Sequence, residues 1–447
     1  NMTHIIYPGT NFKKVESMCI NKSKGIYIYD DSGKKYIEAV AGLWCVGLGF
    51  GNEEIAEVAA KQIEVNSFSH MFSGTTHDVG MKLADKIQQM VPMTNPKVFF
   101  GFSGSDANDT ILRIIQYHAH ATKNPDKRKI IARERAYHGV TYATSALTDL
   151  PSTRNFFNPP TSELGVLRTD HPHYMRGKIL GESENEFVNR IIENLEQLIT
   201  REGPETISTF IAEPIVGAGG VIVPPPGYYQ KLQSVLKKYD IKFWADEVIC
   251  GFGRTGNDFG STTVNIQKPE IMTFAKQLSS GYVPMSAAVI NGDMYESLIE
   301  QSDKSGTFGH GFTYTGHPLA CAITLKTLEI YERENLYENA RKTGEYLFSK
   351  LDNFKKKNIV GEIRGAGLLA AIELVRCSES LEPFKDNNVG KFVYEECKRK
   401  GLIVRSLANN TIVLCPPMII TNTQIDEIIS ILEEVLDLTE VHIFKSQ

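Results

Sequence analysis

Residues 244–256 read WADEVICGFGRTG, an apolar run that ends in two acidic residues and is followed by closely spaced glycines. The glycines from Gly251 to Gly256 match the spacing of a dinucleotide-binding loop, which makes a nicotinamide- or flavin-dependent enzyme one hypothesis. Such a loop needs a strand before it and a helix directly behind it. The run from Ile241 predicts the strand, but NDFGSTTVN after the last glycine is rich in turn residues and has no helical periodicity. The stretch therefore favours Asp246, at the strand end, as the informative residue.

The bulk composition is that of an ordinary globular protein. The chain has 447 residues, of which 42% are hydrophobic and 23% are charged, and its net charge is −5. This length predicts two domains, or one large domain with an appendage. Because there is no basic excess, we expect no nucleic-acid partner. No window approaches the roughly 18 apolar residues of a membrane span and no signal-peptide layout is visible, so we expect a cytoplasmic protein without a membrane partner.

The cysteines and histidines do not form a metal-binding pattern. Seven cysteines are scattered along the chain without a CxxC pair, which predicts reduced thiols in a cytosolic protein. The pairs His118/His120 and His171/His173 have no nearby cysteine or acidic ligands in the sequence. We interpret these histidines as surface residues and predict no metal site.

Short apolar runs alternate with amphipathic helical segments through the middle of the chain, which indicates an α/β fold. Several of the runs end in a polar or charged residue. Because ligands bind beyond the carboxyl ends of parallel strands, the chemistry is expected at those ends. The strand candidates lie at residues 97–103, 129–134, 209–215, 242–248, 271–276 and 285–290.

The two ends of the chain have a different character. GIYIYDDSGKKYIEAV, at residues 25–40, alternates apolar and polar residues around a DDSG turn and predicts a hairpin. From about Leu336 the tail predicts two amphipathic helices and the strands GAGLLAAIEL and TIVLCPP. We predict a large central domain at residues 66–330, flanked by two segments of a small domain at residues 1–65 and 331–447.

Three features at predicted strand ends combine into one chemistry. SGSDAND, at residues 103–109, precedes a helix-like run, so its N–H groups and the Ser105 hydroxyl would bind a phosphate, with an ordinary N-cap as the alternative. Asp246 has a turn carboxylate as its alternative. Lys276 closes an apolar strand, where loss of water lowers the pKa of an amine and makes it nucleophilic; a surface lysine is the alternative. A phosphate site, a carboxylate and a Schiff-base lysine together are what pyridoxal phosphate requires.

The motifs around these residues resemble those of the class III, or omega-amino-acid, aminotransferases, which are pyridoxal phosphate enzymes of fold type I. The resemblance covers nearly the whole chain and looks closest to the pyruvate-dependent omega-transaminases. It implies pyridoxal 5'-phosphate as cofactor, a large domain with a mostly parallel mixed sheet, and a small α+β domain. The matching stretches are AGLWCVGLGFGN, SGSDAND, AYHG, AEPIVGAGGVIVPPPGYY, WADEVICGFGRTG, FAKQLSSGYVPMSA, HGFTYTGHPLACA and GLIVRSLANNTIVLCPPMIIT.

The resemblance also implies roles for single residues. Lys276 would hold the cofactor as an imine and move a proton between substrate and cofactor, and Asp246 would pair with the pyridine nitrogen. Tyr137 and Val248 would pack on the two faces of the ring. The rest of the implied cofactor-binding set comprises Ser103, Gly104, Ser105, His138, Glu213 and, from the neighbouring subunit, Phe312 and Thr313. Those last two residues imply a homodimer with shared active sites.

Two further residues are implied on the substrate side. Arg405 matches a mobile arginine that binds the carboxylate of an amino or keto acid, with a surface arginine as the alternative. Trp44 resembles an aromatic wall of the substrate pocket, with a core tryptophan as the alternative.

The chain departs from the family pattern at three positions. Phe102 stands where the family usually has asparagine, which changes the hydrogen bonding expected around the phosphate loop, and Asp106 replaces the common glutamate. Ala218 stands where the ornithine and 4-aminobutyrate enzymes have a glutamate that neutralises the arginine. Without that acid, pyruvate is favoured over 2-oxoglutarate as the amino acceptor.

The main hypothesis is therefore an omega-transaminase that moves an amino group from an amine or omega-amino acid, such as taurine or beta-alanine, to pyruvate. A 2-oxoglutarate-dependent class III aminotransferase and an aminomutase remain as alternatives with the same cofactor. A nicotinamide-dependent oxidoreductase that uses GFGRTG remains as an alternative of a different class, and a non-catalytic relative is the third.

Overall fold

The computed structural model describes residues 4–445, and its centre is a seven-stranded mixed sheet. Six strands run in one direction and β10 runs antiparallel to both of its neighbours. The predicted α/β fold with a mostly parallel sheet is confirmed, and each of the six strand candidates overlaps a strand. In sheet order the strands are β4 (Lys97–Gly101), β10 (Ser286–Ile290), β9 (Ile271–Phe274), β8 (Lys242–Asp246), β7 (Ile207–Ala212), β5 (Lys129–Arg133) and β6 (Val166–Thr169).

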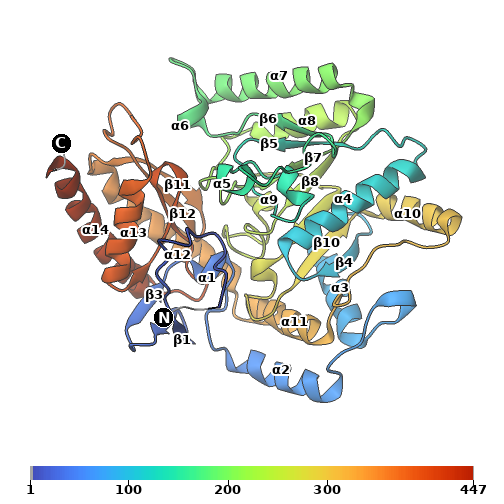
Figure 1. Cartoon of the computed structure of the whole chain (residues 1–447), viewed down its shortest axis with the longest axis horizontal. Coiled ribbons are helices and arrows are strands. Elements are labelled where there is room, and N and C mark those ends of the chain that lie inside the picture. The colour runs from blue at the N-terminus through green and yellow to red at the C-terminus, as the bar shows by residue number, and fades with distance from the viewer. Residues whose placement is uncertain (1–3, 446–447) are drawn as a thin grey trace.

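Helices cover both faces of this sheet (Figure 1). Because side chains alternate across a strand, neighbouring residues enter different hydrophobic clusters. On β8, Phe243 and Ala245 pack in the cluster that contains the apolar faces of α7 and α8, whereas Trp244 packs in the cluster formed with α4 and α10. The long helices around the sheet are α3 (Asp78–Met90), α4 (Gly104–Ala121), α7 (Glu184–Glu202), α8 (Tyr228–Lys238), α10 (Gly292–Ser305) and α11 (Pro318–Arg333).

The two ends of the chain meet in a second sheet. The predicted hairpin is confirmed, with Gly33 at a positive φ of 84° in its turn, and β13 from the C-terminal part pairs in parallel with β3. This sheet contains β1 (Ile20–Lys24), β2 (Tyr27–Asp30), β3 (Lys35–Glu38) and β13 (Leu402–Ile403). A third, antiparallel sheet contains β11 (Val360–Ala366), β12 (Leu369–Leu374), β15 (Thr411–Leu414) and β14 (Arg405–Leu407). The helices of these terminal parts are α2 (Glu53–Val65), α12 (Leu336–Leu351), α13 (Asn388–Arg399) and α14 (Asn422–Lys445).

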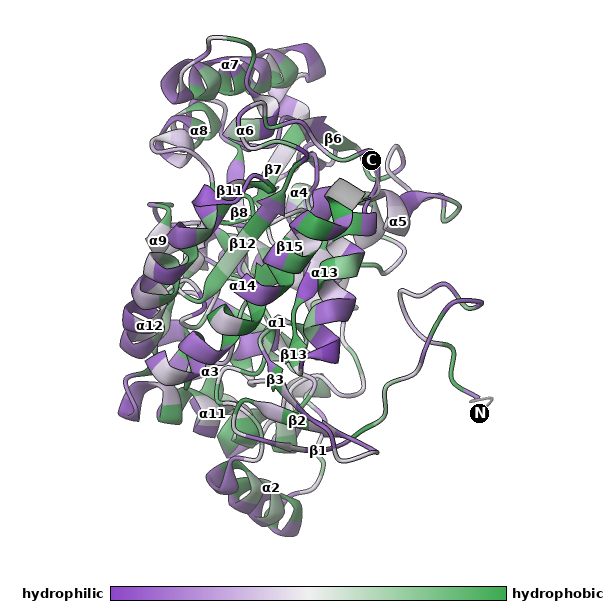
Figure 2. Ribbon diagram, turned by 90° about the vertical axis from the view of Figure 1, so that its left-hand side faces the viewer, coloured by the Kyte–Doolittle hydropathy of each residue, from purple (hydrophilic) through white to green (hydrophobic). Residues whose placement is uncertain are grey.

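The domain boundaries stay a prediction. The boundary expected after residue 330 falls inside α11, and the outer limits at residues 1 and 447 lie outside the described residues. Figure 2 shows the segment before β1 running away from the body of the molecule. The remaining short helices are α1 (Ala41–Trp44), α5 (Pro151–Arg154), α6 (Tyr174–Gly177) and α9 (Gly260–Thr263).

The GFGRTG stretch lies in the loop between β8 and α9, and it packs against the C-terminal part of the chain. No helix opens directly behind it; the next one, α9, has four residues. The Glu247 carboxylate accepts hydrogen bonds from the N–H groups of Gly260 and Ser261 and folds the loop back. The buried Arg254 donates to the carbonyl oxygens of Leu368 and Pro416, at 2.9 and 2.6 Å. The backbone therefore lacks the strand-loop-helix geometry that binds a pyrophosphate.

A buried ionic network also ties β11 and β12 to the segment around α6. Arg364 Nη1 lies 2.6 Å from Glu362 Oε2 and 2.7 Å from Glu373 Oε2, and Arg176 Nε lies 2.7 Å from Glu373 Oε1. His173 Nε2 lies 2.8 Å from Glu362 Oε2 and its side chain is buried, so the interpretation of His173 as a surface residue is wrong. His173, Glu362 and Glu373 are close enough together to hold a metal ion, but the guanidinium groups already pair both carboxylates. The sequence could not show this, because the two acids are about 190 residues away from the histidine along the chain.

Replacement of Arg364 by glutamine should strongly destabilise the fold. It leaves the buried Glu373 carboxylate with a single cationic partner, and breaking such a pair costs about 3–5 kcal/mol. Urea denaturation of the purified protein measures this loss. Arg341→Gln is the matched control, because Arg341 pairs with Glu338 and Glu345 on an exposed face of α12, where water screens the ion pairs and their loss changes stability little. Equal losses in the two variants would contradict the prediction.

Candidate active site

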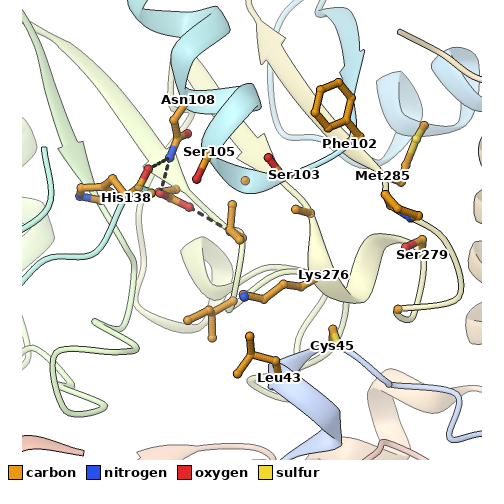
Figure 3. Close-up of a pocket in the computed structure, with 18 of the residues that line it drawn as sticks. Leu43, Cys45, Phe102, Ser103, Ser105, Asn108, His138, Lys276, Ser279 and Met285 are labelled. Carbon is orange, nitrogen blue, oxygen red and sulfur yellow. Dashed lines mark hydrogen bonds and ion pairs between the residues drawn. The ribbon is translucent and has the colours of Figure 1, made fainter. Parts of the chain in front are cut away.

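A cavity of about 450 Å³ opens at the carboxyl ends of the central strands. Its walls come from the end of β8, the start of α4, the segment that follows β9, and the turn around α1. Figure 3 shows the Lys276 side chain reaching into this cavity between the Asn108 and His138 side chains and Leu43. The structure thus brings together Lys276, Asp246 and the SGSDAND segment, as the sequence predicted.

The first turn of α4 lines one end of the cavity, and its free N–H groups make that end suitable for an anion. Ser103 is the N-cap: its Oγ accepts from Asp106 N at 3.1 Å, and Asp106 Oδ1 accepts from Ser103 N at 3.0 Å. Gly104 and Ser105 follow, in the turn whose N–H groups have no partner within the helix. A Cβ on Gly104 would lie 3.0 Å from Val248 Cγ1, so a side chain there would crowd the cavity wall. The N-cap interpretation of Ser103 therefore holds beside the expected anion site.

The Asp246 carboxylate, at the end of β8, is held by two side-chain donors and one backbone N–H. His138 Nδ1 donates to Asp246 Oδ2 at 2.7 Å and Asn108 Nδ2 donates to the same oxygen at 2.9 Å. The other oxygen accepts from Val248 N at 3.1 Å. Within residues 4–445, His138 Nε2 and Asn108 Oδ1 are buried without a hydrogen-bond partner. The carboxylate is consequently fixed in one orientation toward the cavity.

Lys276 begins a short 3-10 turn (Lys276–Leu278) directly after β9. Its φ of 49° is in the left-handed region, which non-glycine residues adopt only under constraint from their surroundings. Burial lowers the pKa of Lys276, and the positive charge of Arg405 acts in the same direction, while Cys45 and Asp246 oppose the shift. A lowered pKa increases the share of neutral, nucleophilic amine at physiological pH.

Tyr137 and Glu213 form the wall near β7. Glu213 Oε1 accepts from Tyr137 N at 2.9 Å and Oε2 accepts from Gly217 N at 2.8 Å. Burial raises the pKa of Glu213. The Tyr137 side chain lines the same cavity as Val248. Glu213 therefore fixes the backbone that carries Tyr137.

The expectation for Trp44 is not met. Its side chain is 3% exposed, packs in a cluster with Val40 and Ile249, and does not line the cavity. Leu43 and Cys45, on either side of it, line the cavity instead. The physical reason is the irregular backbone of α1, where Trp44 has a φ of 67° and the next residues do not continue a helix.

The remaining predicted residues lie outside the cavity of this single chain. Arg405 is exposed at the start of β14 and, among the described residues, has no ion pair or hydrogen bond through its side chain. Phe312 packs edge-on against Phe102 with ring centroids 5.3 Å apart, and Thr313 is exposed. The backbone of Phe102 still contributes a hydrogen bond to the loop before α4, because its N–H donates to Asp106 Oδ2 at 2.8 Å.

Comparison with known proteins agrees with this geometry. Residues 10–436 match the family described as Aminotransferase class-III. The chain belongs to the class III aminotransferases. It is 43% identical over 437 residues to gamma aminobutyrate transaminase 1, mitochondrial, of Solanum lycopersicum, covering 97% of this chain and 84% of the relative. It is 42% identical over 437 residues to vanillin aminotransferase of Capsicum chinense, covering 97% and 94%.

The fold agrees equally well with solved structures. The omega transaminase from Pseudomonas jessenii in complex with PMP superposes with a TM-score of 0.95 at 43% identity, covering 98% of this aminotransferase and 96% of that chain. Another structure, described as a transaminase with L-ala, has a TM-score of 0.92 at 45% identity and covers 95% and 100%. The protein is a pyridoxal-phosphate-dependent aminotransferase of fold type I.

The cavity of this aminotransferase fits pyridoxal phosphate by its donor set. The N–H groups at the start of α4 are suited to the phosphate, the fixed Asp246 carboxylate is suited to the pyridine nitrogen, and Lys276 supplies the amine. The small Gly104 leaves room for close approach. These are the three chemical requirements of the cofactor.

Sequence reasoning missed several lining residues, of which Asn108 is the most informative. It is 1% exposed, lies four residues after Gly104, and therefore points to the same face of α4. That spacing was the only sequence signal, and its partner Asp246 is 138 residues away. Leu43, Cys45, Ser279 and Met285 carried no signal at all.

Asn108→Ala should weaken cofactor binding by about tenfold, because a hydrogen bond to a charged group contributes about 1.5 kcal/mol or more. The dissociation constant of pyridoxal phosphate, measured by titrating the apoprotein, checks this. Asn194→Ala is the matched control, since Asn194 makes the same amide-to-carboxylate bond to Asp170, at 2.8 Å, on the surface. An unchanged dissociation constant for the Asn108 variant would show that His138 suffices to hold Asp246.

Proposed function

We propose that this aminotransferase transfers an amino group from an amine or an omega-amino acid, such as taurine, beta-alanine or a similar donor, to pyruvate. The observation that carries the proposal is that a guanidinium without a partner acts electrostatically on the buried amine of the cavity. Lys276 lies in the cavity, and the exposed Arg405 acts electrostatically on both Lys276 and Tyr137. Ala218, where related enzymes have a neutralising glutamate, leaves that arginine available for a small keto acid.

The residues of the cavity divide the work of the reaction. When bound, pyridoxal phosphate supplies an aldehyde that accepts the amino group and a ring that accepts the electron pair released at the substrate carbon. Lys276 is proposed to attach the cofactor and, once released, to move the proton at the substrate carbon through its Nζ. Asp246, fixed by His138 and Asn108, holds the positive charge on the ring. Tyr137 and Val248 confine the ring between them.

Arg405 is proposed to bind the carboxylate of pyruvate and of amino-acid donors. A guanidinium presents two parallel N–H groups that match a carboxylate. Since the Arg405 side chain is exposed and without a partner among residues 4–445, it is free to turn toward the cavity or toward solvent. This freedom fits a site that must accept both a carboxylate-bearing acceptor and an amine that has none.

We also propose that the enzyme is a homodimer in which Phe312 and Thr313 complete the partner's phosphate site. The support is a set of exposed apolar side chains that a monomer would leave in water. Phe68 and Phe72 are each 45% exposed and Tyr314 is 60% exposed, and the Phe68 and Tyr314 rings pack together. Leu43 of the cavity wall is 51% exposed as well.

The cellular location stays a prediction. Among residues 4–445 there is no helix with the length and apolar character that crossing a membrane demands. The names of several relatives place those proteins in mitochondria or chloroplasts. The cytoplasmic placement therefore rests on the sequence interpretation alone.

A panel of amine donors tests the function. With beta-alanine, taurine, 4-aminobutyrate or an arylalkyl amine as donor, we expect alanine to form from pyruvate and little glutamate to form from 2-oxoglutarate. Lys276→Ala should lower the rate at least about 10³-fold, because it removes both the covalent attachment and the proton transfer. Borohydride reduction should label wild-type Lys276 with the cofactor, and Lys82→Ala, on the exposed face of α3, serves as the control lysine variant.

Some outcomes of this panel would contradict the proposal. Preferential formation of glutamate would favour a 2-oxoglutarate-dependent aminotransferase. A positional shift of the amino group without any acceptor would favour an aminomutase. Nicotinamide binding without a borohydride label on Lys276 would favour the oxidoreductase alternative.

Arg405→Gln should raise the KM for pyruvate and beta-alanine by about 10- to 100-fold, since it removes a charge-assisted hydrogen bond to a carboxylate. The KM for an arylalkyl amine without a carboxylate should stay within about twofold. Steady-state kinetics with each donor measure the difference. Arg399→Gln is the control, because Arg399 pairs with Glu396 on the surface of α13. Equal effects on both donors would mean that Arg405 does not recognise the carboxylate.

A further inference from the structure

The turn from Ala39 to Cys45 is an unusually constrained part of the cavity wall. Ala41, Gly42 and Trp44 have φ angles of 47°, 69° and 67°. For a non-glycine residue this conformation is strained and persists only when the surroundings impose it. Since Leu43 and Cys45 of this turn line the cavity, whatever imposes the conformation also shapes the substrate site.

The Glu38 side chain holds this turn through a hydrogen bond to its backbone. It ends β3, is 6% exposed, and its Oε1 accepts from Val40 N at 3.0 Å. Val40 O in turn accepts from Trp44 N at 2.9 Å, so the bonds run from the carboxylate into the turn. The backbone of Ala39, at the start of the turn, donates to Ile403 O and accepts from Cys415 N.

The carboxylate of Glu38 has no ion pair within residues 4–445. The titratable groups that interact electrostatically with Glu38 are Tyr394 on α13 and Cys415 after β15, and Arg405 on β14 acts on both of those groups. Burial raises the pKa of Tyr394 and raises the pKa of Cys415 to about 12, so both stay neutral at physiological pH. Burial likewise raises the pKa of Glu38 to about 7, and the N–H groups of Val40 and Gly42 oppose that shift. Glu38 is therefore the member of this group that changes charge near neutral pH.

We propose that Glu38 is a positioning residue, whose carboxylate holds the turn Ala39–Cys45 in the shape that receives the substrate and holds it more tightly when ionised. A hydrogen bond to a charged acceptor is shorter and stronger than one to a neutral acceptor. The inference rests on the proposed function, because it takes this cavity as the place where the amine binds.

The sign of the pH dependence follows from the raised pKa. The stability that Glu38 contributes is fully present below the ordinary pKa of a glutamate and is lost as the pH rises through about 7. Over the same window the bonds from the turn to the carboxylate strengthen. Global stability and the order of the turn consequently change in opposite directions, which a purely structural role would not produce.

The test compares Glu38→Gln with the wild-type holoenzyme between pH 6 and pH 8. The glutamine still offers an Oε1 acceptor to Val40 N but does not ionise. The ratio of the amine-donor KM in the variant to that in the wild type should be near one at pH 6 and rise to about fivefold at pH 8, the difference between a neutral and a charged acceptor. The kcat ratio should stay within about twofold across the range.

Glu247→Gln is the matched control. Burial also raises the pKa of Glu247 to about 7, but its carboxylate accepts from Gly260, Ser261 and the Ser261 hydroxyl, away from the turn. Its KM ratio should not change with pH. A flat ratio for Glu38→Gln, or a rise equal to that of the Glu247 variant, would overturn the inference. Failure of the wild type to form alanine from pyruvate would instead overturn the proposed function, so the two failures are distinguishable.

Discussion

The need to hold a buried carboxylate in one orientation organises the centre of this aminotransferase. Asp246 ends β8 in the middle of the sheet, where the cavity opens, and both of its side-chain donors come from elsewhere in the chain. Asn108 requires α4 to start next to β4, and His138 requires the loop after β5 to cross the strand end. Asn108 and His138 donate to the same oxygen atom, Asp246 Oδ2. The strand order and the position of α4 must therefore both bring these donors to the end of β8.

Other charged groups in the molecule show the same constraint, that a buried ionisable side chain must be paired or must change its pKa. Glu362 and Glu373 are paired with Arg364 within the C-terminal sheet, and His173 and Arg176 at α6 pair with the same two acids. Lys276 and Glu38 are not paired in this way, and burial moves the pKa of each toward neutrality. The first pattern stabilises the contact between the C-terminal sheet and α6, whereas the second leaves groups whose pKa lies closer to neutral pH than is usual for their type.

Glycine-rich sequence can mislead when it is considered without its surroundings. GFGRTG has the spacing of a dinucleotide loop, yet here it carries Arg254 to the carbonyl oxygens of Leu368 and Pro416. The two residues before it, Asp246 and Glu247, have the more specific structural roles. One faces the cavity and the other folds the loop back onto the start of α9.

The sequence by itself determined the α/β class, the central strands and the placement of Lys276, Asp246 and SGSDAND at strand ends, because these follow from apolar runs and local chain chemistry. The hairpin at residues 25–40 was equally local. The sequence could not determine that Asn108 meets Asp246, that His173 is buried against Glu362, or that Trp44 turns into the core while Leu43 and Cys45 face the cavity. Those outcomes were decided only by the tertiary structure. They depend on contacts between residues far apart in the chain, and on backbone angles that the surrounding packing imposes rather than local preference.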